Sequence, residues 1–337
     1  MRSFQPSDLR HQAEDALRYA TYDPKKLTFL HTAVALGSSL LLTLVNLLIN
    51  QQITNTGGLS GMGLRSVLST LQSVLDFAVM VALPFWEIGL IFAALGWSRK
   101  EQTDPAVLLR GFRRFRSVLA LNLLRVLLLF IVGFFIIYLI SAVYMFTPLS
   151  EPLWKLIEPL YGSNMTTQEM EAFFTPEMLD SMMRSSIPML VISGVAYASV
   201  AVFLFYRLRF AEYALADGTG AFGSLLRSVR LTGKKRSLAV LKLDLHFWWY
   251  YLVIGLLLVV YFGDMILAAA GVALPVSADM AAVLFSLVAT VCRVVFCRRY
   301  LPVVATTYAV TYQSFCDAAA TDTVQANAPY DAQNARF

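Results

Sequence analysis

Charge is the first thing that this 337-residue sequence lacks. Only 15% of its residues are charged, whereas soluble globular domains average about 25%. Hydrophobic residues make up 58% of the chain and the mean hydropathy is +0.62, which excludes a soluble globular fold and predicts an integral membrane protein. The net charge of +5 would suggest nucleic acid as the partner of a soluble chain. Here the basic residues stand beside apolar runs, so we expect anionic headgroups of the lipid bilayer instead, and no nucleic acid.

Cysteine and histidine are also scarce, with three of each. Cys292, Cys297 and Cys316 form no C-x-x-C motif and have no histidine nearby, which indicates apolar helix residues rather than a metal or redox site. The phosphate-loop pattern G-x-x-x-x-G-K-[ST], the zinc-protease pattern H-E-x-x-H and the hydrolase pattern G-x-S-x-G are missing. We therefore expect no cofactor, no metal and no enzymatic activity.

Long apolar runs are what the chain has in place of these motifs. Six of them are long enough to cross a hydrocarbon core of about 30 Å at about 1.5 Å per residue. They cover residues 27–49, 67–95, 118–146, 187–207, 243–270 and 280–299. The sequence therefore predicts an all-α integral membrane fold with about six transmembrane helices, in a single polytopic domain over residues 27–315. Pro302 is expected to break or bend the last helix, and the tail 316–337 to be disordered.

Polar segments flank and interrupt these runs. Residues 1–26 have mixed charge, unlike a cleaved signal peptide, and predict a short interfacial helix over 7–20 with Ser7 as its N-cap. Residues 147–186 carry six acidic and two basic side chains. Within them, Thr166 with Glu169 and Thr175 with Pro176 are helix-start patterns, so we expect two short helices on the outer face.

Two basic linkers repeat one design. In residues 104–119 and again in the linker 207–249, apolar side chains recur at helical spacing while basic side chains project from the other flank. The apolar positions are Leu108, Phe112, Phe115 and Leu119 in the first linker, and Phe222, Leu225, Leu226 and Val229 in the second. The basic positions are Arg110, Arg113, Arg114, Arg227, Arg230, Lys234, Lys235 and Arg236. We predict two cytoplasmic, basic amphipathic helices in the membrane plane that contact lipid headgroups or other membrane proteins.

The distribution of Lys and Arg predicts the orientation. Of the 27 basic residues, 23 fall within residues 1–26, 96–117 and 207–249 or after Val291, and only Arg65, Lys155 and Arg184 fall on the other side. The positive-inside rule then places both termini and both linkers in the cytoplasm of a multi-pass plasma-membrane protein.

Three ionisable residues lie within the apolar runs, where a charge is costly unless it is paired or hydrated. Asp76 and Glu87 are eleven residues apart, close to three helical turns, so they share a helix face. Glu87 and Arg125 lie at matching depth in adjacent helices, which predicts an ion pair between them. A structural clasp is the favoured interpretation, and a proton or substrate relay is the alternative. Asp244, at the end of the second linker, is expected in the solvated cytoplasmic interface.

The two linkers also resemble each other: Leu108-Leu109-Arg110 and Leu225-Leu226-Arg227 each precede a basic cluster. Either a helix–linker–helix unit was duplicated, or two linkers that meet the same lipid surface converged in composition.

Several short motifs resemble a known family. They are PFWEIG at 84–89, DPAVLLRGFRRF at 104–115, AEYALAD at 211–217, SVRLTGKKRSLAVLKL at 228–243 and LPVVATTYAVTY at 301–312. In that order they resemble the bacterial polytopic membrane proteins of the domain of unknown function 975, which is similar to the membrane domain of some glycerophosphodiester phosphodiesterases. The resemblance implies a bacterial plasma-membrane protein and supplies no catalytic residue.

Two classes of function remain open from the sequence. The first is a non-enzymatic membrane module that contacts lipid or partner proteins through the basic linkers. The second is a small solute or lipid transporter that uses Asp76, Glu87 and Arg125.

Overall fold

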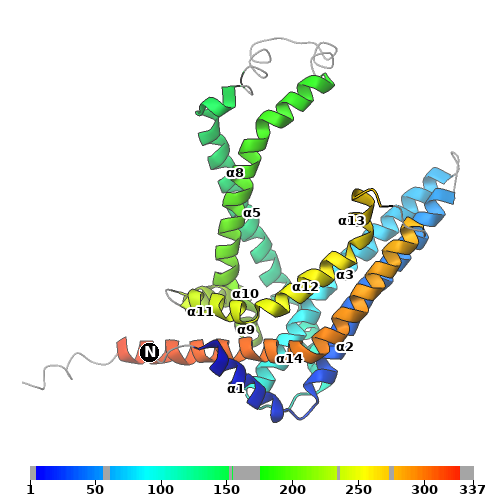
Figure 1. The fold of residues 1–337 in the computed structure, drawn as a ribbon. Helices are drawn as coiled ribbons and strands as arrows, with labels where there is room; N and C mark the ends of the chain where they lie inside the picture. Colours follow the sequence, from blue (N-terminus) through cyan, green and yellow to red (C-terminus); the bar gives the residue numbers. More distant parts are fainter. Residues whose placement is uncertain are drawn as a thin grey trace, which may run out of the picture. The chain divides into compact units, whose positions relative to one another are not determined.

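The computed structural model describes residues 5–55, 61–151, 154, 175–233, 236–272 and 277–326, and every regular element in these ranges is a helix (Figure 1). The chain forms two compact units, which we call the first unit, Met1–Leu121 with Leu208–Phe337, and the second unit, Asn122–Arg207. The single domain expected over 27–315 stays a prediction.

The helices have the following bounds. In the first unit lie α1 (Pro6–Arg18), α2 (Pro24–Asn55), α3 (Gly61–Ser98), the 3-10 helix η1 (Pro105–Leu109), α4 (Arg110–Arg113), α9 (Ala211–Ala216), α10 (Ala221–Leu231), α11 (Arg236–His246), α12 (Trp248–Tyr261), α13 (Gly263–Ala269) and α14 (Ala278–Ala326). The helix α5 (Phe115–Met145) starts in the first unit and continues into the second, which also holds η2 (Pro148–Ser150) and nearly all of α8 (Pro176–Leu208).

Helix length and hydropathy make this a polytopic membrane protein. Five stretches are long and apolar enough to cross a membrane: Pro24–Ile49, Ser66–Ser98, Phe115–Met145, Met183–Ala216 and Met280–Thr321. A sixth is added if Arg236–His246 and Trp248–Tyr261, which are bent by 62° at their junction, form one span. The prediction of about six membrane helices agrees with this number.

The fifth predicted helix, 243–270, is not continuous. It is divided among α11, α12 and α13, with breaks at Phe247 and Phe262. Next to the break at Phe262, Gly263 lies close to α14, since a Cβ on Gly263 would lie 2.7 Å from a ring carbon of Phe285. Glycine permits this close approach because it has no side chain.

The sixth predicted helix is longer than expected. Pro302 lies inside α14, which continues to Ala326, so the predicted disorder of the tail from residue 316 is wrong as far as residue 326. Figure 1 shows α14 changing direction along its length, as a helix does when a proline removes one backbone hydrogen bond. The part after Pro302 is stabilised by packing, because Ala309, Tyr312 and Phe315 are buried.

The predicted N-terminal helix is present as α1, but it begins one residue before Ser7. Gln5 takes the N-cap position and Pro6 follows it, so Ser7 is not the cap. Leu9 and Ala13 of α1 pack against Val310 of α14. The apolar face that we expected to lie in the membrane interface is thus covered by α14, beside which α1 lies in Figure 1.

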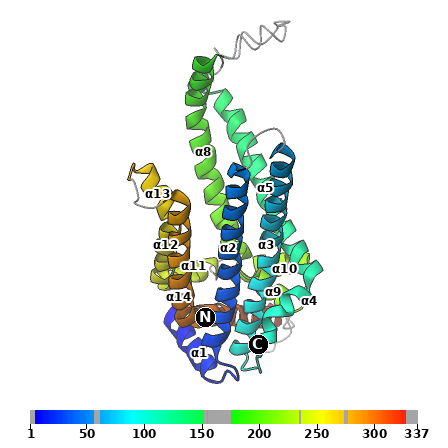
Figure 2. The ribbon, with the colours of Figure 1, turned by 90° about the vertical axis from the view of Figure 1, so that its right-hand side faces the viewer.

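Helices α2 and α3 lie side by side, as Figure 2 shows, and both also contact α14. The rings of His31 in α2 and Trp86 in α3 are stacked, with centroids 5.9 Å apart. The indole Nε1 of Trp86 also donates a hydrogen bond of 2.9 Å to the backbone carbonyl of His31. These contacts join the two helices at one level.

The first basic linker is not the single in-plane helix that the sequence predicts. It consists of η1 and α4, followed by α5, and it crosses α3 with almost no space between the backbones. A Cβ on Gly111 would lie 1.9 Å from the carbonyl oxygen of Phe85, and a Cβ on Gly89 would lie 2.1 Å from that of Leu108. Two glycines, one from each segment, therefore make this crossing possible.

The second unit contains the parts of α5 and α8 between residues 122 and 207. A Cβ on Gly133 would lie 2.9 Å from the ring of Tyr197, and the hydroxyl of Tyr144 donates a 2.9 Å hydrogen bond to the carbonyl of Ser185. The helix start expected at Thr175 and Pro176 is confirmed as the beginning of α8, but the expected short outer helix is wrong, because α8 continues through Pro188 to Leu208 as one helix with the predicted span 187–207. The other expected start, at Thr166 and Glu169, lies outside the described residues.

Candidate functional site

The three intramembrane residues singled out from the sequence have separate surroundings. Asp76 accepts a 3.2 Å hydrogen bond from the side-chain amide of Asn46, which joins α3 to α2. Glu87 is exposed along α3, and the charges that act on it include those of Glu212 and Arg293. Arg125 is half-buried in the second unit, so its pairing with Glu87 stays a prediction.

The second basic linker forms α9, α10 and α11. The side of α10 that faces the protein is not the apolar side that the sequence predicts. Its inward positions are Ser224, Ser228 and Leu231, all buried. The Ser228 hydroxyl accepts a 3.1 Å hydrogen bond from the backbone N–H of Phe210. Two buried hydroxyl groups thus share the inner side of α10 with Leu231 and with Ala221 and Leu225, which pack against a buried apolar cluster.

Of the four predicted apolar residues of α10, three face away from the protein, whereas Leu225 packs against the core. Phe222 is 65% exposed and Leu226 is 44% exposed, and Val229 lies on the same side. With a rotation of about 100° per residue, this stripe is opposite the buried serines. Arg230 is exposed on its flank. In the first linker, Leu109 and Phe112 are likewise exposed.

The predicted basic surface divides into two groups. Arg110, Arg113 and Arg230 are exposed, as a headgroup-contacting surface requires. Arg114 is exposed as well but donates a 2.7 Å hydrogen bond to the carbonyl of Leu215, and Arg227 contacts Asp217, so both contribute to the fold. Arg236 is the first residue of α11, and Lys234 and Lys235 lie outside the described residues.

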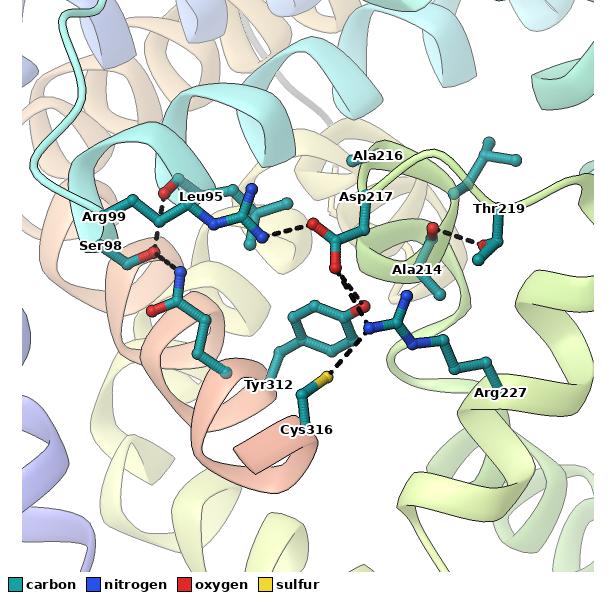
Figure 3. Close-up of polar contacts among 12 residues, drawn as sticks. Leu95, Ser98, Arg99, Ala214, Ala216, Asp217, Thr219, Arg227, Tyr312 and Cys316 are labelled. Atoms are coloured by element: carbon teal, nitrogen blue, oxygen red, sulfur yellow. Dashed lines mark hydrogen bonds and ion pairs between the residues drawn. The ribbon is translucent and has the colours of Figure 1, made fainter. Parts of the chain in front are cut away.

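The polar cluster around Asp217 was not foreseen as a site (Figure 3). Arg99, at the end of α3, forms an ion pair with Oδ1 of Asp217. Oδ2 accepts hydrogen bonds of 3.2 Å from Arg227 in α10 and 3.0 Å from the hydroxyl of Tyr312 in α14. Arg227 also lies 3.4 Å from the sulfur of Cys316. One carboxylate thus joins three helices to the turn that follows α9.

Backbone geometry places Asp217 at this junction. The residue after it, Gly218, has φ of +101°, a left-handed conformation that ends α9 at little steric cost. Thr219 then turns its hydroxyl back to the carbonyl of Ala214 at 2.5 Å and contacts the hydroxyl of Ser224 at 2.7 Å. The Gly218-Thr219-Gly220 segment is therefore a turn between helices.

The charges in this cluster stabilise one another. Burial by itself would raise the pKa of Asp217, but the hydrogen bond and charge of Arg99, the hydroxyl of Tyr312 and the charge of Arg227 hold that pKa below its ordinary value. Burial lowers the pKa of the Arg99 guanidinium, but Asp217 more than offsets this effect, so that pKa is raised. The cluster borders a pocket of about 380 Å³ that Gln313 and Asp317 also line.

A second cluster that combines an aspartate with arginine and tyrosine surrounds Asp244 in α11. Its Oδ1 accepts hydrogen bonds from the hydroxyl of Tyr308 and, at 3.3 Å, from that of Tyr251, and it lies 3.8 Å from Arg209. Arg209 also lies over the ring of Tyr308, 4.6 Å from its centroid. Because Tyr308 and Tyr312 are four residues apart, one face of α14 serves both aspartates.

The sequence did contain a signal for these clusters. Asp217 ends the motif AEYALAD, and Tyr308 and Tyr312 recur at helical spacing in LPVVATTYAVTY. Asp76 and Glu87 were singled out because they lie at membrane depth. That criterion does not identify aspartates that pair with arginine and tyrosine at the ends of the spans. The expectation that Asp244 is solvated is wrong, because its side chain is only 15% exposed and is held by two tyrosine hydroxyls.

Comparisons with protein-family models, with curated proteins and with solved structures found no match to this chain. The resemblance of its motifs to a bacterial membrane family is therefore a hypothesis that rests on those motifs alone.

Proposed function

We propose that this membrane protein is a non-enzymatic module whose cytoplasmic face contacts anionic lipid headgroups through α10 and the η1–α4 segment. The observation that carries the proposal is the exposed apolar stripe of α10, formed by Phe222, Leu226 and Val229 on the side opposite the buried serines. In water, the exposed stripe of Phe222 and Leu226 would be unfavourable, whereas in a bilayer interface it is buried among lipid chains.

Charge supports the same assignment. Arg230 on α10 and Arg110 and Arg113 in the first linker are exposed beside apolar residues. A basic residue near an anionic membrane surface contributes about 1 kcal/mol to binding. The excess of Lys and Arg in these segments also supports the cytoplasmic side, where anionic lipids are enriched.

The two aspartate clusters fix this surface to the spans. Asp217 joins the turn before α10 to α3 and α14, and Asp244 joins α11 to α14. Arg227 makes a direct link between α10 and Asp217. In this proposal they hold α10 at one depth and angle relative to the membrane helices of the first unit, and they perform no chemistry.

The test is the depth of α10 in a bilayer. A nitroxide label is placed at Leu226→Cys or, as a control, at Gln102→Cys, an exposed position outside the candidate spans, in a background with Cys292 and Cys316 replaced by serine. In vesicles that contain phosphatidylglycerol, we expect the label at position 226 to collide with oxygen more than with a water-soluble nickel complex, and the control to show the reverse. Nickel-dominated collisions at position 226 would contradict the proposal.

A further inference from the structure

A second pocket lies where α1, α2 and α14 meet. It has a volume of about 240 Å³ and is lined by Leu17 and Arg18 of α1, Pro24 and Lys25 of α2, and Arg299 and Pro302 of α14. All three elements belong to the first unit. The pocket therefore combines the end of one helix, the start of a second and the proline site of a third.

Three cations converge on this pocket from three helices. Two carboxylates also line it, but both are engaged. Glu14 accepts a 2.8 Å hydrogen bond from Arg10, and Asp23 accepts a 2.9 Å hydrogen bond from the backbone N–H of Lys25. The local balance thus favours positive charge.

Two of the three cations have no carboxylate partner in the described ranges. Arg18 lies 3.5 Å from Asp15, with both side chains largely exposed. For Lys25 and Arg299, the described part of the chain shows no ion pair, and Arg299 lies over the ring of Tyr300 at 5.5 Å. An anion between these two groups would therefore meet two positive charges that form no ion pair in the described ranges.

The remaining lining and the position of the pocket indicate the class of anion. Leu17, Pro24 and Pro302 supply an apolar wall next to the cations. Pro24 is the first residue of a candidate membrane span, and Pro302 lies within another. Basic pockets between membrane helices on the cytoplasmic side bind phospholipid headgroups. A phosphate with an attached glycerol fits the cations and the apolar wall together.

We propose that this pocket binds the phosphodiester of an anionic phospholipid, with the phosphate between Lys25 and Arg299. The inference rests on the proposed function only in placing this face at the lipid headgroups, since it uses none of the residues of α10 or of the basic linkers. The shared chemistry is a phosphate anion, and a free phosphate is the competing source.

Retention of lipid by the purified protein tests this site. The full chain is released from nanodiscs of mixed phosphatidylglycerol and phosphatidylcholine, and native mass spectrometry measures the mass of the protein with its bound lipid. The variant Lys25→Gln/Arg299→Gln should retain phosphatidylglycerol several-fold less than the wild type. Lys26→Gln/Arg298→Gln is the matched control, because it removes the same charge from neighbouring residues that do not line the pocket. An equal loss in both variants, or no loss in either, would overturn the site.

A second variant keeps every charge. Val303, which also lines the pocket, is replaced by Phe to fill the space. Loss of phosphatidylglycerol from Val303→Phe supports a pocket of defined shape, and unchanged retention overturns it. Because this variant is independent of the charge variants, a folding failure in one set leaves the other informative.

Two further results separate the alternatives. The first is binding of glycerol 3-phosphate or inorganic phosphate to the detergent-solubilised protein through Lys25 and Arg299, without selective retention of phosphatidylglycerol. This result would identify the ligand as a soluble phosphate and overturn the lipid site. If the label at position 226 lies in water while phosphatidylglycerol is retained through Lys25, the proposed function fails and this site stands.

Discussion

Gly111 and Phe85 approach so closely that a Cβ added to Gly111 would lie 1.9 Å from the carbonyl oxygen of Phe85. The reciprocal contact, between Gly89 and the backbone of Leu108, lies four residues further along α3. The first basic linker is therefore held by direct backbone contact with a membrane helix. Phe85 also stacks on Phe115, with ring centroids 4.7 Å apart, at the start of α5.

The close crossing of the first basic linker and α3 predicts that one added methyl group at Gly111 strongly lowers stability. Gly111→Ala should lower the free energy of unfolding by about 3 kcal/mol, because the backbones must separate. Gly223→Ala in α10 is the control, since its nearest contact is a side-chain atom at 3.9 Å, and alanine there should stabilise the helix by about 1 kcal/mol. Thermal unfolding in detergent measures both. Equal melting temperatures for the two variants would disprove a tight crossing.

Asp217 should be the most sensitive carboxylate of the described first unit. Asp217→Asn removes the negative charge that Arg99 and Arg227 share, and we expect a loss of about 2 kcal/mol, the scale of one hydrogen bond between charged groups. Asp104→Asn is the control, because Asp104 is exposed and makes no side-chain capping bond. Its effect should stay within about 0.5 kcal/mol. A similar small effect at Asp217 would show that the cluster contributes nothing to stability.

The same cluster predicts a pH dependence with a defined sign. Since the pKa of Asp217 is lower in the folded protein than in the unfolded chain, its stabilisation is present above the unfolded value of about 3.9. It is lost as the pH falls through the lower, folded pKa. The wild type should therefore lose more stability than Asp217→Asn between about pH 5 and pH 2. Parallel melting curves of the two proteins over that range would contradict this linkage.

Glu87 allows the structural and transport hypotheses to be compared. If Glu87 and Arg125 form the predicted ion pair, Glu87→Gln alone should cost more stability than Glu87→Gln/Arg125→Gln, because it leaves an unpaired charge at membrane depth. A single variant that costs no more than the double variant would exclude the pair. A solute or proton flux in vesicles that Glu87→Gln abolishes, in a folded protein, would favour the transporter.

The described part of the fold shows which structural features a sequence pattern can predict. The apolar runs predicted the membrane helices because length and hydropathy are properties of each segment alone. The runs could not show that Pro302 lies within one helix, because residues such as Tyr312 and Phe315 hold the second half of α14 in place by tertiary packing. Periodicity likewise identified the apolar stripe of α10 and could not tell which side the protein would cover.

The sequence by itself determined that this is a helical membrane protein with basic segments between its spans, because hydropathy and charge act locally and add along the chain. Only the tertiary structure decided that Asp217 and Asp244 meet their arginines and tyrosines, that Gly89 and Gly111 allow a backbone crossing, and that α1 packs on α14. Such contacts join distant parts of the chain, as the hydrogen bond from Gln313 to Ser98 does across 215 positions. A pairing at that separation depends on where the helices pack, which no local pattern encodes.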